Sequence, residues 1–210
     1  SELTMRAVTE GFIPTLTHFQ MAEAISGVVK NPTSVYLKID AGLGRLGEPL
    51  DSARQWVEKI FQLPNLRIEG IYTHVPFADS KQRDWAAQRL QAFDQFVAEL
   101  KNAGYQFSVT QAMASCCLLA RLQDHCNAVC VGHALYGLSP FSSPGSVDVS
   151  QLRPVMKNLK SRIIHTSYHA EGSDIAVGGL YGLKRPRTIG VLPTGMAHGL
   201  CKPVEGQVMA

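Results

Sequence analysis

Short apolar runs and longer amphipathic stretches alternate along most of the chain. The short runs are rich in β-branched and aromatic residues, which is typical of buried strands. In the longer stretches apolar residues recur every three or four positions, as on a helix with one buried face. Residues 85–103 show this most clearly, with one stripe made of Leu90, Phe93, Phe96, Val97 and Leu100. The pattern predicts strands at 13–16, 35–39, 68–72, 107–110 and 129–131, and helices at 19–29, 51–62, 85–103 and 115–122.

This alternation of strands and helices predicts an α/β fold with a parallel sheet, and its repeats suit part of a (β/α)₈ barrel like that of the TIM fold. The pattern changes after Pro140, because residues 141–150 are rich in Ser, Pro and Gly and indicate a linker. Beyond it, residues 155–167 and 175–192 look like strands without intervening helices. We therefore predict a partial barrel at residues 1–148, followed by the start of a β-rich C-terminal domain at 149–210.

Composition narrows the range of partners. The formal net charge is only +3 and the basic residues are scattered, which favours neither nucleic acid nor a membrane surface. No apolar run has the length of a membrane span or the form of a signal peptide.

The cysteines give a further expectation about compartment and metals. Cys116 and Cys117 are adjacent in an apolar helix-like run, so we expect free, buried thiols in a reducing compartment, the cytoplasm. Cys126 and Cys130 lie near two histidines, but their spacing fits no common zinc pattern. The strand-like residues between them would send alternate side chains to opposite faces. We expect these two cysteines to pack in the core, and we expect no metal site.

The most informative stretch is residues 34–48. Lys38 and Asp40 stand at the C-terminal end of a predicted buried strand, where charges are costly without partners. Glycines at 42, 44 and 47 then surround Arg45, so the backbone can come close to a ligand while the arginine supplies a cationic fork. Such a loop suits an anionic ligand. From composition alone, an ordinary turn with a surface arginine would be favoured.

Residues 38–47 also closely resemble the Lys-x-Asp-Thr-Gly-Met-Gly-Arg-Leu-Gly segment of the alanine racemase family, whose members are fold-type-III enzymes that use pyridoxal 5′-phosphate (PLP). Further segments resemble that family in the same order, including its Gly-x-x-Thr-His and Ala-x-Tyr-Gly-x-x-Pro patterns. These segments are residues 70–74, 134–140, 159–163 and 191–199. Collinear matches along nearly the whole chain are specific to a family in a way that one glycine loop is not.

The resemblance assigns PLP contacts to several residues of this chain. Arg45 matches the arginine that binds the phenolic oxygen, and Lys38 matches a lysine, often carbamylated, that pairs with that arginine. His74 matches the histidine beside the cofactor ring; taken alone, it would more simply be a core histidine at a strand end. The residues that match the family's phosphate site are Ser115, Gly132 and His133; Ser115 would also serve as a plain helix cap.

Two departures from the family concern the chemistry itself. Cys130 stands where the family has an arginine at the pyridine nitrogen, and a thiol is a weak, uncharged donor. Val177 stands where the family has the tyrosine that acts as one of two catalytic bases, and valine cannot move a proton. By family spacing, we expect the lysine that forms the Schiff base to lie upstream of Ser1 and the β domain to continue beyond Ala210.

The resemblance thus implies a homodimeric PLP-dependent racemase that interconverts L- and D-alanine or a related small amino acid. The alternative is a PLP-dependent relative with altered, one-base or non-racemase chemistry, which Cys130 and Val177 favour. A third reading is a non-catalytic PLP-binding homologue that kept the barrel and lost the bases.

Overall fold

The computed structural model describes residues 2–142 and 147–200, with side chains from Arg6 onward. The chain divides into two compact units, Ser1–Val155 and Met156–Ala210. The domain boundary at 148/149 expected from the sequence stays a prediction. Within the described residues, no helix combines the length and the apolar character needed to cross a membrane.

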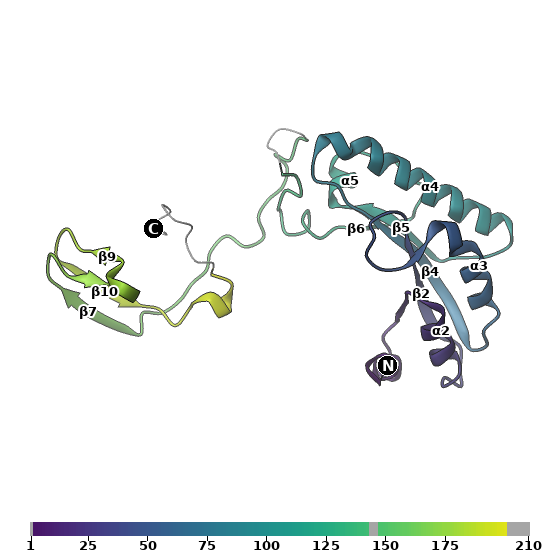
Figure 1. Cartoon of the computed structure of the whole chain (residues 1–210), viewed down its shortest axis with the longest axis horizontal. Helices are drawn as coiled ribbons and strands as arrows, with labels where there is room; N and C mark the ends of the chain where they lie inside the picture. Colours follow the sequence, from purple (N-terminus) through teal and green to yellow (C-terminus); the bar gives the residue numbers. More distant parts are fainter. Residues whose placement is uncertain (1, 143–146, 201–210) are drawn as a thin grey trace. The chain divides into compact units, whose positions relative to one another are not determined.

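The first unit is built on a parallel sheet with helices between its strands (Figure 1). The strands lie in the spatial order β1 (Thr15–Leu16), β2 (Thr33–Asp40), β4 (Leu66–Val75), β5 (Val109–Ala114) and β6 (Ala128–Cys130), and β3 (Glu48–Pro49) pairs with β2. The helices are α1 (Glu2–Thr9), α2 (Phe19–Ser26), α3 (Leu50–Phe61), η1 (Ser80–Gln82), α4 (Arg83–Asn102) and α5 (Ser115–Leu119). The predicted α/β fold with a partial barrel is confirmed, while α1 and β3 were not predicted.

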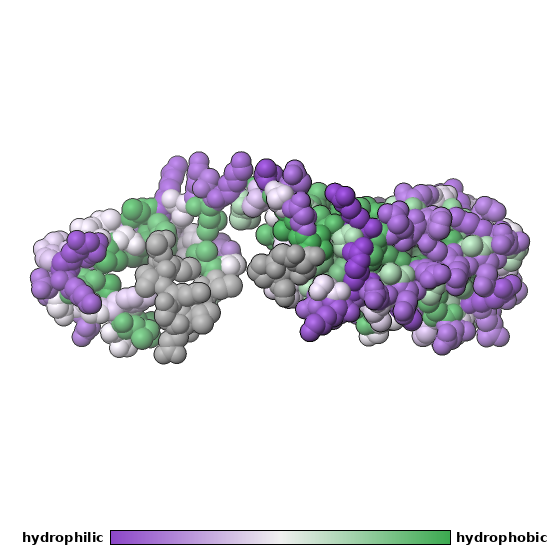
Figure 2. Space-filling model, turned by 90° about the horizontal axis from the view of Figure 1, so that it is seen from above, coloured by the Kyte–Doolittle hydropathy of each residue, from purple (hydrophilic) through white to green (hydrophobic). Residues whose placement is uncertain are grey.

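The core of this unit lies between the sheet and its helices. α2 packs against β1, α3 against β2, and α4 against β4 and β5. The predicted stripe of α4 is buried as expected, and α3 buries Ala53, Trp56, Val57 and Ile60 at helical spacing. Each large aliphatic side chain buried in this way contributes about 1.5–3 kcal/mol. The solvent-facing surface of this unit is mainly hydrophilic, as Figure 2 shows.

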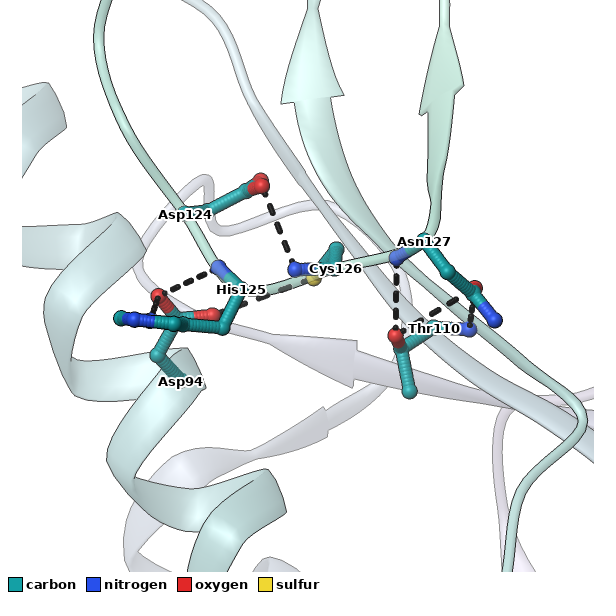
Figure 3. Close-up of polar contacts among 6 residues, drawn as sticks. All are labelled: Asp94, Thr110, Asp124, His125, Cys126 and Asn127. Carbon is teal, nitrogen blue, oxygen red and sulfur yellow. Dashed lines mark hydrogen bonds and ion pairs between the residues drawn. The ribbon is translucent and has the colours of Figure 1, made fainter.

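A set of polar contacts fastens the segment before β6 to its neighbours (Figure 3). Thr110 and Asn127 bond reciprocally, since the Thr110 N–H donates to Asn127 Oδ1 at 2.8 Å and the Asn127 N–H donates to Thr110 Oγ1 at 3.2 Å. Asp94 of α4 accepts from the backbone N–H of His125 at 3.0 Å. These bonds lie at the amino-terminal ends of β5 and β6 and hold the two strands in register there.

The second unit holds two small antiparallel pairs. β7 (His165–His169) pairs with β10 (Arg187–Val191), and β8 (Asp174–Ile175) pairs with β9 (Tyr181–Gly182). The short turns η2 (Val177–Gly179) and η3 (Met196–His198) complete its described part. This is the start of the β-rich domain that the sequence predicts.

Two strands predicted in this unit were wrong in extent. The strand expected at 155–167 begins only at His165, because no strand among the described residues pairs with the part of the chain before it. The strand expected at 175–192 is interrupted by η2, where Gly178 and Gly179 adopt positive φ angles of 72° and 67°. Positive φ bends the chain out of the extended conformation, so Tyr181 does not continue a straight strand from Val177.

Two further expectations need correction in the first unit. The linker expected at 141–150 is wrong at its first residue, since the rings of Phe141 and Phe77 pack with centroids 5.6 Å apart. Cys116 and Cys117 are free and buried, as predicted, but Cys130 is exposed. Core packing was therefore the wrong expectation for Cys130. The physical reason is that β6 is the edge strand of the described sheet and nothing described covers it.

Candidate functional site

Asp40 organises the glycine loop that follows β2. Its carboxylate accepts hydrogen bonds from the backbone N–H groups of Gly42 at 2.8 Å, Leu43 at 2.7 Å and Arg45 at 3.0 Å. Burial alone would raise the pKa of Asp40, but the backbone donors outweigh it and hold that pKa below its usual value. Sequence reasoning assigned Asp40 no role. An aspartate directly before a glycine-rich turn was the available signal, because such carboxylates often bond the backbone ahead of them.

Gly47 closes the same loop back onto β2. Its φ is +114°, and a Cβ added there would lie 2.7 Å from the backbone oxygen of Lys38. Only glycine fits both the conformation and the space. The loop can therefore turn around Arg45 and return beside the strand, where Glu48 of β3 pairs with Ile39.

Lys38 is a buried cation, with its side chain 6% exposed. Burial lowers its pKa from 10.5 to about 8; the charge of Asp40 opposes this change, and that of Arg45 adds to it. The pKa of His74 is also lowered, by burial first and then by the charges of Lys38 and Arg45. The imidazole of His74 is consequently neutral at neutral pH. These mutual effects place three predicted site residues, from β2, its loop and β4, in one electrostatic environment.

A cavity of about 490 Å³ opens where β4, β5 and β6 end. It contains five predicted site residues, namely His74, Ser115, Cys130, Gly132 and His133. Lys38 and Arg45 are not part of its lining and lie on the β2 side of His74. The volume falls in the range of about 300–1,000 Å³ that is usual for small-molecule sites. The carboxyl ends of parallel barrel strands are also where such ligands bind.

Ser115 starts α5 at the floor of this cavity and is 3% exposed. Its Oγ accepts the backbone N–H of Ala134 at 3.2 Å, which ties the helix start to the loop after β6. His133 and Gly132 lie in that loop and are exposed to the cavity side. Ser115 and the loop that carries Gly132 and His133 therefore line the same cavity.

Cys116 is a cavity residue that sequence reasoning missed as part of the site. Its Sγ accepts the backbone N–H of Phe77 at 3.1 Å, while the Cys117 thiol donates to the Val75 oxygen at 3.0 Å. The neighbouring Cys117 side chain first, and then the hydrogen bond from the Phe77 N–H, lower the pKa of Cys116, while burial opposes this change. The only sequence signal was its position next to Ser115. No group of three or more His, Cys, Asp or Glu among the described residues is arranged to hold a metal ion.

Val177 belongs to the second unit. It lies in η2 and is 89% exposed. Ala176 before it has φ of 70° and ψ of 176°, a backbone conformation that residues other than glycine rarely adopt. Valine offers no group that titrates, so the position expected to carry a base holds none.

The fold and the cavity together define a barrel-type α/β protein with a histidine-containing cavity at the carboxyl ends of its strands. Residues 1–140 match the family model described as "Alanine racemase, N-terminal domain". The chain belongs to the alanine racemase family.

Curated relatives and solved structures agree with this assignment. The chain is 30% identical over 205 residues to the alanine racemase of Desulfosudis oleivorans, covering 92% of this chain and 52% of that protein. It is 34% identical over 176 residues to that of Geobacter sp. strain M21, covering 82% and 46%. The alanine racemase structure of Clostridium difficile 630 matches with a TM-score of 0.79 at 24% identity, covering 95% and 53%, which shows the shared fold. The chain thus spans about half the length of these relatives.

Proposed function

We propose that this chain carries the PLP-binding part of an amino-acid racemase that acts on alanine or a related small amino acid. The observation that supports this most is the cavity at the ends of β4, β5 and β6, which combines His74, Ser115, Gly132 and His133 beside the cations of Lys38 and Arg45. A homodimer is part of the same proposal and rests on the family resemblance, and a cytoplasmic location rests on the free, buried thiols of Cys116 and Cys117.

The residues fit PLP on the chemistry of their donors. Ser115 Oγ is buried and faces a loop of backbone donors, which suits a phosphate. A Cβ built on Gly132 would meet nothing within 4 Å, so a ligand group has room to approach the backbone there. The cations on the β2 side suit the phenolic oxygen at the other end of the cofactor.

Each residue then has a defined task. Ser115 and the backbone of Gly132 and His133 would bind the phosphate, and Arg45 would donate to the phenolic oxygen. His74, which is neutral at neutral pH, would lie beside the ring without adding charge. When bound, PLP draws electrons away from the α-carbon of an amino acid and makes its proton acidic. Racemisation by two bases also requires one base on each face of that carbon, because the proton is removed from one face and returned to the other.

PLP binding tests the proposal directly. Ser115→Ala should raise the PLP dissociation constant about 5–10-fold, since it removes one hydrogen bond to a charged group. Ser52→Ala is the matched control, because Ser52 is exposed on α3 and bonds Glu48 rather than the cavity. Equilibrium dialysis of both variants provides the comparison. Equal dissociation constants for Ser115→Ala and the unmodified chain would contradict the phosphate assignment.

Val177 and Cys130 favour a second candidate, a PLP-dependent relative with one-base or non-racemase chemistry. One is an exposed valine and the other an exposed thiol, where the family resemblance calls for a tyrosine and an arginine. A non-catalytic PLP-binding homologue is the limiting case of this candidate.

Restoring both groups separates the candidates. In a two-base racemase that lost its tyrosine, Val177→Tyr combined with Cys130→Arg should raise alanine racemisation, and a well-placed base contributes about 10²–10⁴-fold. If the second candidate is correct, the two substitutions together leave alanine racemisation negligible. Chiral chromatography gives the rate, and solvent deuterium incorporation is measured alongside. Deuterium uptake with retained configuration in the unmodified protein would identify one-base chemistry.

A further inference from the structure

A second cavity, of about 440 Å³, lies between the glycine loop after β2, the start of α3 and one face of α4. It shares no lining residue with the cavity at the ends of β4, β5 and β6. Its volume also falls in the range that is usual for small-molecule sites. The proposed function gives this second cavity no role, so its own charges and apolar surface decide what it can bind.

Among the residues that line this cavity, Arg89 of α4 is the only cation. Its Nε atom is buried and finds no hydrogen-bond acceptor in the described part of the chain. The ion pairs formed by the described residues do not include its guanidinium either. A guanidinium carries five N–H donors in a fixed fork that suits a carboxylate. Arg89 therefore brings to the cavity a cation without an anionic partner.

The stem of Arg89 packs against the glycine loop. A Cβ added to Gly42 would lie 3.1 Å from Arg89 Cδ, 3.8 Å from its Nη1 and 3.6 Å from Cζ2 of Trp85. Trp85 precedes Arg89 by four positions on α4, so the two side chains occupy the same face of the helix. These contacts restrain the stem and keep the guanidinium at the loop end of the cavity.

Three carboxylates share the cavity with Arg89, and their surroundings differ. That of Asp40 is occupied by backbone N–H groups of the loop. Glu99 follows Arg89 by ten positions, about 15 Å along the helix axis, and approaches Arg54 at 3.9 Å. Asp51, in the first turn of α3, forms no ion pair with any described residue. The charges of Asp51 and Arg89 therefore border one cavity without contacting each other.

These mixed charges select the ligand. A plain anion would be attracted by Arg89 but repelled by the carboxylates, and a plain cation would meet the reverse. A zwitterion satisfies both, and Leu50, Ala92 and Phe96 give the lining an apolar part. We propose that this cavity binds a free α-amino acid with an apolar side chain, whose carboxylate accepts hydrogen bonds from Arg89 and whose ammonium group donates to Asp51. This inference depends neither on PLP nor on racemisation.

Binding of L-leucine to the full chain without PLP, measured by isothermal titration calorimetry, tests the proposal. Two analogues each keep one of its charges, since 3-methylbutylamine lacks the carboxylate and 4-methylpentanoate lacks the ammonium group. We expect saturable binding of leucine, and binding of 3-methylbutylamine that is weaker by about 10-fold or more. The loss for 4-methylpentanoate should be smaller, about 3-fold or more, because Asp51 is exposed. This comparison needs no variant, so it remains decisive if a variant does not fold.

Two variants assign the charges of the ligand. Arg89→Gln should weaken leucine binding about 10-fold or more and should not weaken binding of 3-methylbutylamine, which has no carboxylate to lose a partner. Asp51→Asn should weaken leucine binding about 3-fold and should not weaken binding of 4-methylpentanoate. A general loss of structure would not produce this crossed pattern.

Matched controls lie outside the cavity. Arg67→Gln removes an arginine of β4 whose guanidinium bonds Ser34. Asp84→Asn removes the acidic residue in the first turn of α4, the place that Asp51 occupies in α3. Neither substitution should change the dissociation constant of leucine.

Three results would overturn the inference. These are no saturable binding of leucine at millimolar concentrations, an analogue that binds as tightly as leucine, and equal weakening by Arg89→Gln and Arg67→Gln. Equal affinity for 4-methylpentanoate would identify a plain anion site, and equal affinity for 3-methylbutylamine a plain cation site. Failure of the phosphate assignment, seen as unaltered PLP binding in Ser115→Ala, is a separate outcome, because none of these titrations involves PLP.

Discussion

Replacing Gly47 by alanine tests whether the loop after β2 depends on its close return to Lys38. The new Cβ would lie 2.7 Å from the Lys38 oxygen and 2.9 Å from the carbonyl carbons of Lys38 and Ile39, all backbone atoms of a central strand. These atoms cannot rotate away as a flexible side chain would. Either the strand or the loop must move, and both carry residues of the candidate site.

The cost has two parts. An L-residue held at a positive φ such as +114° is strained by about 1–3 kcal/mol. Forcing an extra carbon against fixed neighbours adds about 1–3 kcal/mol more. The sum, about 2–6 kcal/mol, is large against the typical 5–15 kcal/mol that stabilises a domain. Gly44→Ala is the matched control: φ is +71° there, but a Cβ meets nothing within 4 Å, so only strain of about 1–2 kcal/mol applies.

Urea unfolding followed by tryptophan fluorescence measures both variants. Trp56 and Trp85 are the two tryptophans of the chain and both lie in the first unit, so the signal reports on that unit alone. With a slope of about 2 kcal/mol per molar urea, the midpoint should fall by roughly 1–3 M in Gly47→Ala and by under about 1 M in Gly44→Ala. The reasoning is refuted if Gly47→Ala unfolds at the same urea concentration as Gly44→Ala, or above it.

Two shorter predictions concern the strand ends. The folded pKa of Lys38, about 8, lies below the unfolded value of 10.5, so the unfolded chain binds more protons between these pH values and stability rises with pH there. Lys38→Met should flatten that rise and stabilise the chain below pH 8, by up to about 3 kcal/mol before solvent screening; an unchanged pH profile of urea midpoints would count against this. Asn127→Ala should cost about 1–2 kcal/mol by leaving the Thr110 N–H without an acceptor, whereas exposed Asn31→Ala should cost nearly nothing in the same assay.

The fold was predictable from sequence wherever burial makes apolar residues recur at a regular spacing. The stripe of α4 and the apolar runs of β2 and β4 each repeat with the spacing of one secondary structure, so type and approximate position follow from the pattern. Residues 156–164 show the limit of that reasoning. Their apolar side chains resemble those of a strand, but a strand also needs a neighbour to bond, and the sequence does not say where one lies.

The candidate site was predictable where it depends on strand ends, and not where it depends on register. Lys38, His74 and Ser115 each follow or end an apolar run, and parallel strands bring such positions to one edge. The pairing of Lys38 with Tyr72 is different. Val35 pairs with Ile68, and the same offset of 33 would place Ile71 beside Lys38. An irregularity after Val35 shifts the register by one residue, which puts the tyrosine there instead.

The residues proposed to bind the cofactor and the position expected to carry a base lie in different units of the chain. The residues that would hold the cofactor lie in the first unit, and Val177, at the position expected to carry a base, lies in the second. Cofactor affinity and proton transfer therefore depend on different parts of the sequence, and the loss of one does not require the loss of the other. A chain that has Ser115, His74 and Arg45 but lacks a base at position 177 should bind PLP whether or not it racemises alanine. Measuring PLP affinity and racemisation separately is thus the comparison that distinguishes a racemase from a homologue that only binds the cofactor.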